Sequence, residues 1–254
     1  NTILITEKSN NTLVDYSKKN KIPIIEHRKY IGGRYSVLSE VGMVPAYLMG
    51  FKIESFRKNI LKYFENKNQN KFTKNTSEIC NIYLSKKINS IIFLDYSHNL
   101  KNFLYWAQQL LAESLGKNKL GLMPFISLAP KDHHSLLQLY LDGPKDKLFY
   151  IFSLKLTKKM KINKNIFGKS FGHVENKDFS KAKEAQKNAL IHVLKSKNIP
   201  YQEFIMNKKD EETLGKLFSY FIMETVLIGK LIGVNPFDQP AVEEVKILTK
   251  KYLS

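Results

Sequence analysis

The chain between residues 88 and 253 alternates regularly between short apolar runs and longer amphipathic segments. The apolar runs have the length of strands and lie at 88–97, 119–129, 147–156 and 199–206. The segments that predict helices lie at 99–116, 132–144, 178–198, 212–233 and 240–253. Strands that alternate with helices favour a parallel sheet that helices cover on both faces. The sequence therefore predicts an α/β fold, an αβα sandwich around a central parallel sheet.

The beginning of the chain is less regular. It predicts two short strands, at 2–6 and 21–27, with a helix at 10–20 between them. An amphipathic helix is expected at 54–72. The Asn- and Lys-rich stretch at 66–75 is the best candidate for a hinge or linker.

The net charge of +18 raises the possibility of a nucleic-acid partner. Only three of the 41 basic residues are arginines, however, and the lysines are spread over the whole chain. Proteins that bind nucleic acids specifically use arginine forks and interleave aromatic with basic residues. The charge is therefore interpreted as a lysine-rich composition that solvates the surface, and no specific nucleic-acid binding is expected.

Composition also indicates the cellular compartment in which the protein is expected. The single cysteine, Cys80, excludes an internal disulfide framework and a cysteine-rich zinc site, and is typical of the reducing cytoplasm. No apolar run approaches the ~18 to 20 residues of a membrane span, so no membrane partner is expected. The chain starts with NTILITEK, without an initiator Met or a signal segment, and is interpreted as a piece of a longer protein.

A lone glutamate near the end of the predicted helix 99–116 is the first candidate for chemistry. Gly116 ends this helix, so Glu113 lies in its last turn, where the helix dipole disfavours a negative charge. A carboxylate in such a place suits general acid/base work. Gln109 lies one turn earlier on the same face. The alternative is a terminal glutamate that pairs with a nearby lysine, Lys117 or Lys119.

Two adjacent histidines follow the predicted strand 119–129. Asp132 is a natural N-cap for the next helix, which places His133 and His134 at its first positions. There the positive end of the helix dipole keeps an imidazole neutral and able to act as a base. Adjacent histidines lack the spacing of a zinc pair, so no metal site is expected. A purely structural role remains the alternative.

Two further stretches carry weaker signals. In IGGRYS, two glycines place Arg34 at a helix entrance, where a guanidinium and backbone N–H groups converge on an anion. The alternative is a tight turn with a salt-bridged arginine. In NPFDQPAVEEVK, Pro240 starts a helix that Asp238 or Gln239 caps, and a surface ion pair with Glu243 is the default interpretation of Lys246.

Taken together and in order, four stretches resemble the glucose-6-phosphate isomerase (phosphoglucose isomerase) family. IGGRYSVLSEVG resembles the Gly-Gly-Arg-Phe/Tyr-Ser signature, and QQLLAESLGK resembles the segment with the catalytic glutamate. DHHSLLQLYLDGP resembles the segment with the catalytic histidine, and NPFDQPAVEEVK resembles the carboxy-terminal signature. The resemblance covers essentially the whole chain. It departs from the family pattern at Lys29, Glu40 and Ala241.

The resemblance implies two flavodoxin-like sugar-isomerase (SIS) domains. Residues 1–66 would be the C-terminal remainder of the first SIS domain with connecting helices, and 67–254 the second SIS domain with a C-terminal helix. The phosphate-binding loop of the first domain is not visible in this sequence. The chain alone is therefore expected to turn over little or no substrate.

The resemblance also implies a mechanism and partners. Glucose 6-phosphate and fructose 6-phosphate would interconvert through a cis-enediol, without a metal or organic cofactor, in a cytoplasmic homodimer of glycolysis and gluconeogenesis. Glu113 would move the proton between C2 and C1, and Arg34 would stabilise the enediolate. His134 and Lys246 would open the sugar ring. The residues that position the sugar would be Gly33 and Gln109.

Two alternatives stay open. The chain could be the isomerase half of a fused enzyme, for example with a transaldolase-type partner. It could also be a non-catalytic SIS module that senses sugar phosphates, although a sensor has no need of the base Glu113.

Overall fold

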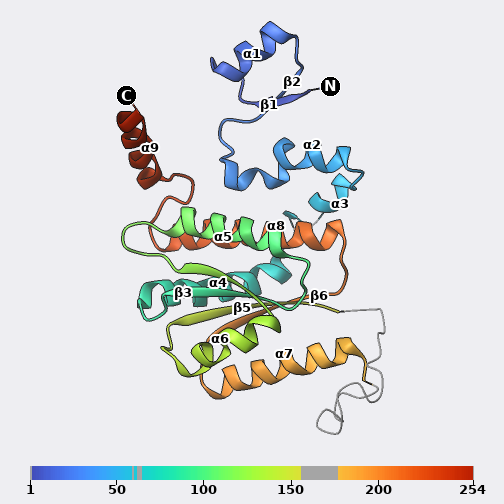
Figure 1. The fold of residues 1–254 in the computed structure, drawn as a ribbon, viewed down its shortest axis with the longest axis vertical. Helices are drawn as coiled ribbons and strands as arrows, with labels where there is room; N and C mark the ends of the chain where they lie inside the picture. Colours follow the sequence, from blue (N-terminus) through green and yellow to red (C-terminus); the bar gives the residue numbers. More distant parts are fainter. Residues whose placement is uncertain (1, 59, 62–64, 156–176, 254) are drawn as a thin grey trace. The chain divides into compact units, whose positions relative to one another are not determined.

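The computed structural model describes residues 2–58, 60–61, 65–155 and 177–253. Figure 1 shows the helices and strands of the chain. The chain divides into two compact units. The first unit, the terminal unit, comprises residues 1–80, 113–115 and 210–254. The second unit, the sheet unit, comprises residues 81–112 and 116–209. The predicted domain boundary between residues 66 and 67 stays a prediction.

The sheet unit is built on four parallel strands. They are β3 (Ser90–Asp95), β4 (Met123–Leu128), β5 (Lys147–Leu154) and β6 (Tyr201–Met206). Their order in the sheet is β4-β3-β5-β6, and each neighbouring pair is parallel. All six residues of β3 are buried, as expected for a central strand of a parallel sheet. The predicted α/β fold with a central parallel sheet is confirmed.

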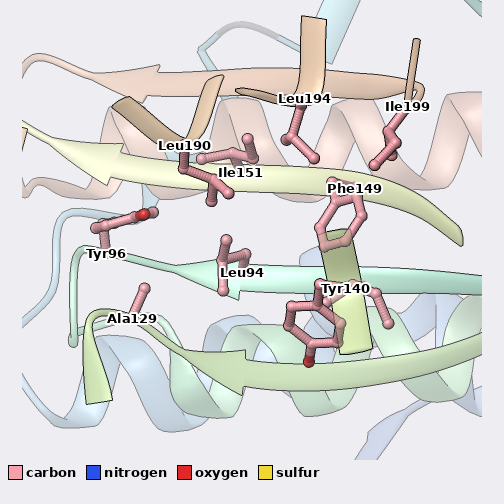
Figure 2. Packing of buried hydrophobic residues seen from close by; sticks show 10 residues of the cluster. Leu94, Tyr96, Ala129, Tyr140, Phe149, Ile151, Leu190, Leu194 and Ile199 are labelled. Carbon is pink, nitrogen blue, oxygen red and sulfur yellow. The ribbon is translucent and has the colours of Figure 1, made fainter. Parts of the chain in front are cut away.

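Helices cover both faces of this sheet. On one face lie α6 (Lys131–Asp142) and α7 (Phe179–Ser196), whose side chains pack on those of β3 and β5 (Figure 2). Leu190 and Leu194 of α7 and Tyr140 of α6 belong to this core. On the other face, Phe103 of α5 (Lys101–Leu115) contacts the ring of Phe152. Because successive side chains of a strand point to opposite faces of the sheet, each face of the sheet has its own set of apolar side chains.

The terminal unit contains a small sheet and several helices. The strands β1 (Leu4–Thr6) and β2 (Ile24–Glu26) pair in parallel, with α1 (Thr12–Asn20) between them in sequence. The following elements are the 3₁₀ helix η1 (Gly33–Leu38), α2 (Glu40–Leu48), α3 (Ile53–Arg57), α8 (Glu211–Leu231) and α9 (Pro240–Leu253). A Cβ atom added to Gly215 of α8 would lie 2.0 Å from the carbonyl oxygen of Phe56, so only glycine permits this close packing.

Two expectations for the region around residue 66 are wrong. The predicted helix at 54–72 is not continuous, because α3 ends at Arg57 and α4 spans Asn66–Ser85. The predicted linker at 66–75 lies inside α4. The helix forms there because Phe72, Thr76 and Ile79 recur at helical spacing on one face and are buried. Their polar Asn and Lys neighbours occupy positions between them in sequence.

Among the described helices, none is both long and apolar enough to cross a membrane.

Candidate active site

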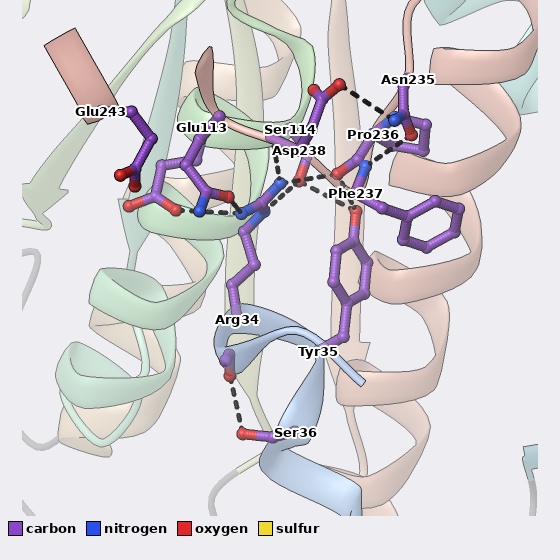
Figure 3. A network of polar contacts seen from close by, with 12 residues as sticks. Arg34, Tyr35, Ser36, Glu113, Ser114, Asn235, Pro236, Phe237, Asp238 and Glu243 are labelled. Carbon is purple, nitrogen blue, oxygen red and sulfur yellow. Dashed lines mark hydrogen bonds and ion pairs between the residues drawn. The ribbon is translucent and has the colours of Figure 1, made fainter. Parts of the chain in front are cut away.

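Arg34, in the first turn of η1, is the centre of a polar network in the terminal unit (Figure 3). Its guanidinium is buried, with 4% of the side chain exposed. Nε donates to Ser114 Oγ at 2.8 Å, and Nη1 donates to Glu113 Oε2 at 3.2 Å and to Gln239 Oε1 at 2.6 Å. Nη2 donates to the backbone carbonyls of Pro236 and Asp238, both at 2.8 Å. These five bonds match the five N–H donors of an arginine, so the guanidinium is held in one orientation.

Glu113 forms an ion pair with this guanidinium and stands in the last turns of α5, as predicted. The N–H of Gly116 caps the helix by donating to the carbonyl of Ala112 at 3.0 Å. The Glu113 side chain is 34% exposed, whereas Arg34 is almost fully buried. The cation is therefore shielded from solvent, while the carboxylate stays accessible to it.

Tyr35 also supports the arginine. Its hydroxyl lies 2.9 Å from Ser114 Oγ and 2.9 Å from the carbonyl oxygen of Pro236. Burial raises the pKa of Tyr35 above its ordinary value, so the hydroxyl keeps its proton and can donate. Each hydroxyl has both a donor and an acceptor if the hydrogen bonds run in one direction. Ser114 then accepts from Arg34 and donates to Tyr35, and Tyr35 donates to the carbonyl of Pro236.

Several members of this network are not identified by sequence reasoning. Ser114 and Tyr35 adjoin predicted residues, but no local pattern marks their side chains as partners of Arg34. Asp238 and Gln239 are predicted only as caps of α9, which does begin at Pro240 as expected. In the structure the Gln239 side chain instead accepts from Arg34.

The turn that leads into Arg34 is fixed by His27 and Glu40. His27 Nδ1 lies 2.5 Å from Glu40 Oε1, and His27 Nε2 lies 2.9 Å from the carbonyl oxygen of Ile31. The backbone N–H of Arg28 also donates to Glu40 Oε1, at 3.3 Å. Hydrogen bonds from its own backbone N–H, from His27 and from Arg28 lower the pKa of Glu40. Glu40 thus holds the chain that precedes the glycine pair.

Gly33 begins η1 and is exposed, and no atom lies within 4 Å of a Cβ added there. Gln109 is an exposed residue of α5, one turn before Glu113. The structure holds no sugar, so the predicted positioning roles of both residues stay predictions.

The two adjacent histidines differ in their surroundings. His133 is partly buried, and its Nε2 lies 2.7 Å from the hydroxyl of Tyr96, whereas His134 is exposed. Burial lowers the pKa of His133. The predicted N-cap role of Asp132 is wrong, because α6 begins at Lys131. Asp132 instead accepts from the backbone N–H of Leu128 at 2.7 Å and ties the helix to the end of β4.

Lys246 of α9 forms the expected surface ion pair. Its Nζ lies 2.6 Å from Glu243 Oε1, and both side chains are more than half exposed. Lys246 is therefore accessible from solvent. The structure brings Arg34 and Glu113 into contact, while the participation of His134 and Lys246 in the same site stays a prediction.

A mostly apolar pocket of about 580 Å³ lies in the terminal unit, between η1, α2 and α8. Tyr35 and Phe237 line it, but neither Arg34 nor Glu113 does. The pocket is therefore distinct from the guanidinium–carboxylate pair. Within the described part of the chain, no group of three or more His, Cys, Asp or Glu side chains is arranged to hold a metal ion.

Comparison with known proteins extends this picture. Residues 3–129 match the family model described as phosphoglucose isomerase. The glucose-6-phosphate isomerase of Campylobacter jejuni is 32% identical, over 88% of this chain and 56% of that protein. The glucose-6-phosphate isomerase of Methanocaldococcus jannaschii is 31% identical, over 91% of this chain and 58% of that protein. The chain thus spans little more than half the length of these relatives.

Two crystal structures share the fold. A hypothetical protein from Thermus thermophilus superposes with a TM-score of 0.87 at 24% identity, over 99% of this chain and 62% of that one. A glucose-6-phosphate isomerase from Chlamydia trachomatis superposes with a TM-score of 0.77 at 17% identity, over 99% of this chain and 52% of that one. At these identities the likeness concerns the fold alone.

Proposed function

Because the chain belongs to the phosphoglucose isomerase family, we propose that it carries catalytic residues for the interconversion of glucose 6-phosphate and fructose 6-phosphate. The observation that carries this proposal is the contact between Arg34 and Glu113. An aldose–ketose isomerase needs a base for the proton that moves between C2 and C1, and a cation for the charge that develops on the enediolate oxygens. A partly exposed carboxylate beside a fixed guanidinium supplies both.

In the proposed reaction, Glu113 removes the proton from C2 of the open-chain aldose and returns it to C1. Arg34 stabilises the enediolate without moving, because its five hydrogen bonds already hold it in place. Because its N–H groups already donate to the protein, this effect comes from the positive charge, which is fixed and needs no reorganisation during the reaction.

Ring opening precedes the proton transfer, and we assign it to His134 and Lys246. Both side chains are exposed. Lys246 can donate to a sugar oxygen, and a neutral imidazole can accept a proton from one. Gly33, which has open space beside it, and Gln109 would position the sugar.

The wider setting forms part of the same proposal. We propose a homodimer in the cytoplasm that acts in glycolysis and gluconeogenesis, with a sugar phosphate as its small-molecule partner. We also propose that the boundary between two SIS domains lies at residues 66 and 67. The support is the family membership and, for the compartment, a single cysteine that is buried as a free thiol.

The test is a coupled assay of fructose 6-phosphate conversion by the protein at its full natural length and by two variants of it, because the chain alone is expected to turn over little or no substrate. Replacement of a positioned general base typically lowers the rate by about 10² to 10⁴, which is the loss expected for Glu113→Gln. Glu244→Gln, at an exposed position of α9, is the matched control and should keep the wild-type rate. Equal rates for Glu113→Gln and wild type would overturn the proposal.

A further inference from the structure

The first turn of α6 carries His134, the histidine assigned to ring opening. The first N–H groups of any helix have no partner within the helix, so this turn is the part that frays most easily. In α6 the N-cap residue, Pro130, offers these groups no side-chain hydrogen bond. His134 itself is exposed and makes no hydrogen bond or ion pair with another residue that the structure describes. The position of His134 therefore follows the position of the backbone around it.

Two neighbouring side chains tie this turn to the ends of two adjacent strands. Asp132 Oδ2 accepts from the backbone N–H of Leu128 at 2.7 Å and from Ser127 Oγ at 3.1 Å, both in the last two residues of β4. His133 Nε2 lies 2.7 Å from the hydroxyl of Tyr96, which directly follows β3. The strands β3 and β4 are hydrogen-bonded neighbours. The turn is thus held at two points, whereas a turn held at one point alone is free to pivot about it.

Tyr96 is a firm anchor for this contact. Its side chain is 3% exposed and belongs to the apolar core on the α6 and α7 face of the sheet (Figure 2). Its backbone N–H donates to the carbonyl of Phe152 in β5 at 2.8 Å. The rings of Tyr96 and His133 pack edge to face, with their centroids 5.5 Å apart. The tyrosine is fixed to the sheet, so its contact with His133 orients the first turn of α6 relative to the sheet.

In this hydrogen bond the tyrosine donates and the histidine accepts. His133 is the one hydrogen-bond partner of the Tyr96 hydroxyl among the described residues, so a donating imidazole would leave a buried O–H without an acceptor. Burial raises the pKa of Tyr96 and lowers that of His133, although the charge of Asp132 partly offsets the second shift. Both shifts favour the neutral side chains. A neutral imidazole that accepts at Nε2 carries its proton on Nδ1.

We propose that His133 is a positioning residue, which holds His134 in place for ring opening through the hydrogen bond that it accepts from Tyr96. The inference rests on the proposed function, because it assumes the role of His134. A group that transfers a proton must lie within roughly 2.6 to 3.2 Å of the atom it serves. A displacement of about 1 Å can cost about 10²-fold in rate, so an anchor for the first turn of α6 affects ring opening without touching the sugar. Every residue that the inference uses belongs to the sheet unit.

The test measures ring opening by itself, with the protein at its full natural length. The α and β anomers of glucose 6-phosphate interconvert only through the open chain, so the catalysed exchange between their NMR signals reports this step. Tyr96→Phe removes the donor and His133→Leu removes the acceptor, and each should slow the catalysed exchange by about tenfold or more. His133→Gln should keep most of the rate, because the amide oxygen of glutamine can accept the same hydrogen bond.

Tyr201→Phe is the matched control for the loss of a tyrosine hydroxyl. Tyr201 packs against the same core cluster, and its hydroxyl makes no hydrogen bond with another residue in the described part of the chain. This variant should open the ring at the wild-type rate. His134→Ala is the reference for the proposed function and should lose the catalysed exchange. A wild-type rate in His134→Ala would reject the role of His134 itself, and the inference with it.

A double-mutant cycle separates positioning from a general loss of stability. If Tyr96 and His133 act through their contact, Tyr96→Phe and His133→Leu together should slow ring opening no further than either change alone. With His134→Ala inactive, the inference is overturned if Tyr96→Phe opens the ring as fast as the wild type, or if the two effects multiply. It is also overturned if His133→Gln is as slow as His133→Leu. This last comparison decides the question even if Tyr96→Phe fails to fold.

Discussion

The Nη1 atom of Arg34 lies 3.2 Å from Oε2 of Glu113, although 79 residues separate them in sequence. The arginine is buried, and the glutamate is one-third exposed. This asymmetry supports the proposed division of roles, in which the fixed cation stabilises charge and the accessible carboxylate moves a proton.

The stability of the terminal unit should depend on the fork geometry of Arg34. Lysine in Arg34→Lys keeps the charge but has three donors where arginine has five. Each hydrogen bond to a charged group contributes about 1.5 to 3 kcal/mol, so the variant should lose at least about 1.5 kcal/mol of unfolding free energy. Urea unfolding measures the loss. Arg28→Lys, at an exposed position, should be nearly neutral, and equal stability of both variants would show that the fork is dispensable.

The Tyr35 hydroxyl should hold Arg34 in place through Ser114. In Tyr35→Phe, Ser114 loses its acceptor and the Pro236 carbonyl loses a donor. The Arg34 Nε–H should then exchange faster with solvent, and stability should fall by about 0.5 to 1.5 kcal/mol.

Nitrogen-15 NMR can measure this exchange directly, because the chain has only three arginines and so only three Nε–H signals. Tyr30→Phe is the control, since Tyr30 is 79% exposed. Unchanged protection of Arg34 in Tyr35→Phe would remove Tyr35 from its supporting role.

The pKa of Glu40 predicts a pH dependence of stability. Its folded pKa lies below the ordinary value of 4.5, so the unfolded state binds the proton more tightly. Its stabilising contribution is therefore present above pH 4.5 and is lost as the pH falls through the folded pKa. Glu40→Gln should be less stable than the wild type near neutral pH, and this difference should shrink in acid. A difference that grows in acid would contradict the sign of the shift.

The lysine excess should give no specific affinity for nucleic acids. Binding to duplex DNA should be independent of sequence and should weaken steeply as salt is added, because it rests on counter-ion release alone. Fluorescence titrations at several salt concentrations check this. A sequence-selective complex that survives high salt would restore the nucleic-acid interpretation.

Local sequence pattern predicts the sheet unit well and the site poorly. The strand at 88–97 can be predicted because a fully buried strand is a continuous apolar run. The helix at 99–116 can be predicted because its apolar residues recur at helical spacing along one buried face. The stretch at 66–75 is wrongly predicted as a linker, although it lies in α4, because its few buried side chains, such as Phe72, have mostly Asn and Lys as neighbours in sequence. The contact between Arg34 and Glu113 depends on tertiary packing, which no local period encodes.

The resemblance of four ordered motifs to the family predicts which distant residues belong to one site, which periodicity cannot do. It pairs Arg34 with Glu113 as parts of one site, and the structure places them in contact. It says nothing of Tyr35 as a hydrogen-bonding residue, because the signature accepts phenylalanine there as well. The hydroxyl contacts of Tyr35 appear only once the fold is known.

The central claim is that Glu113 is the base of an isomerisation, and solvent tritium exchange into fructose 6-phosphate tests it most directly. The natural protein should exchange the proton at C1, while Glu113→Gln should bind the sugar phosphate with nearly unchanged affinity and exchange almost nothing. The amide keeps the shape and hydrogen bonding of the carboxylate but cannot take up a proton. Exchange by the variant at the wild-type rate would contradict the account and assign the base to another residue.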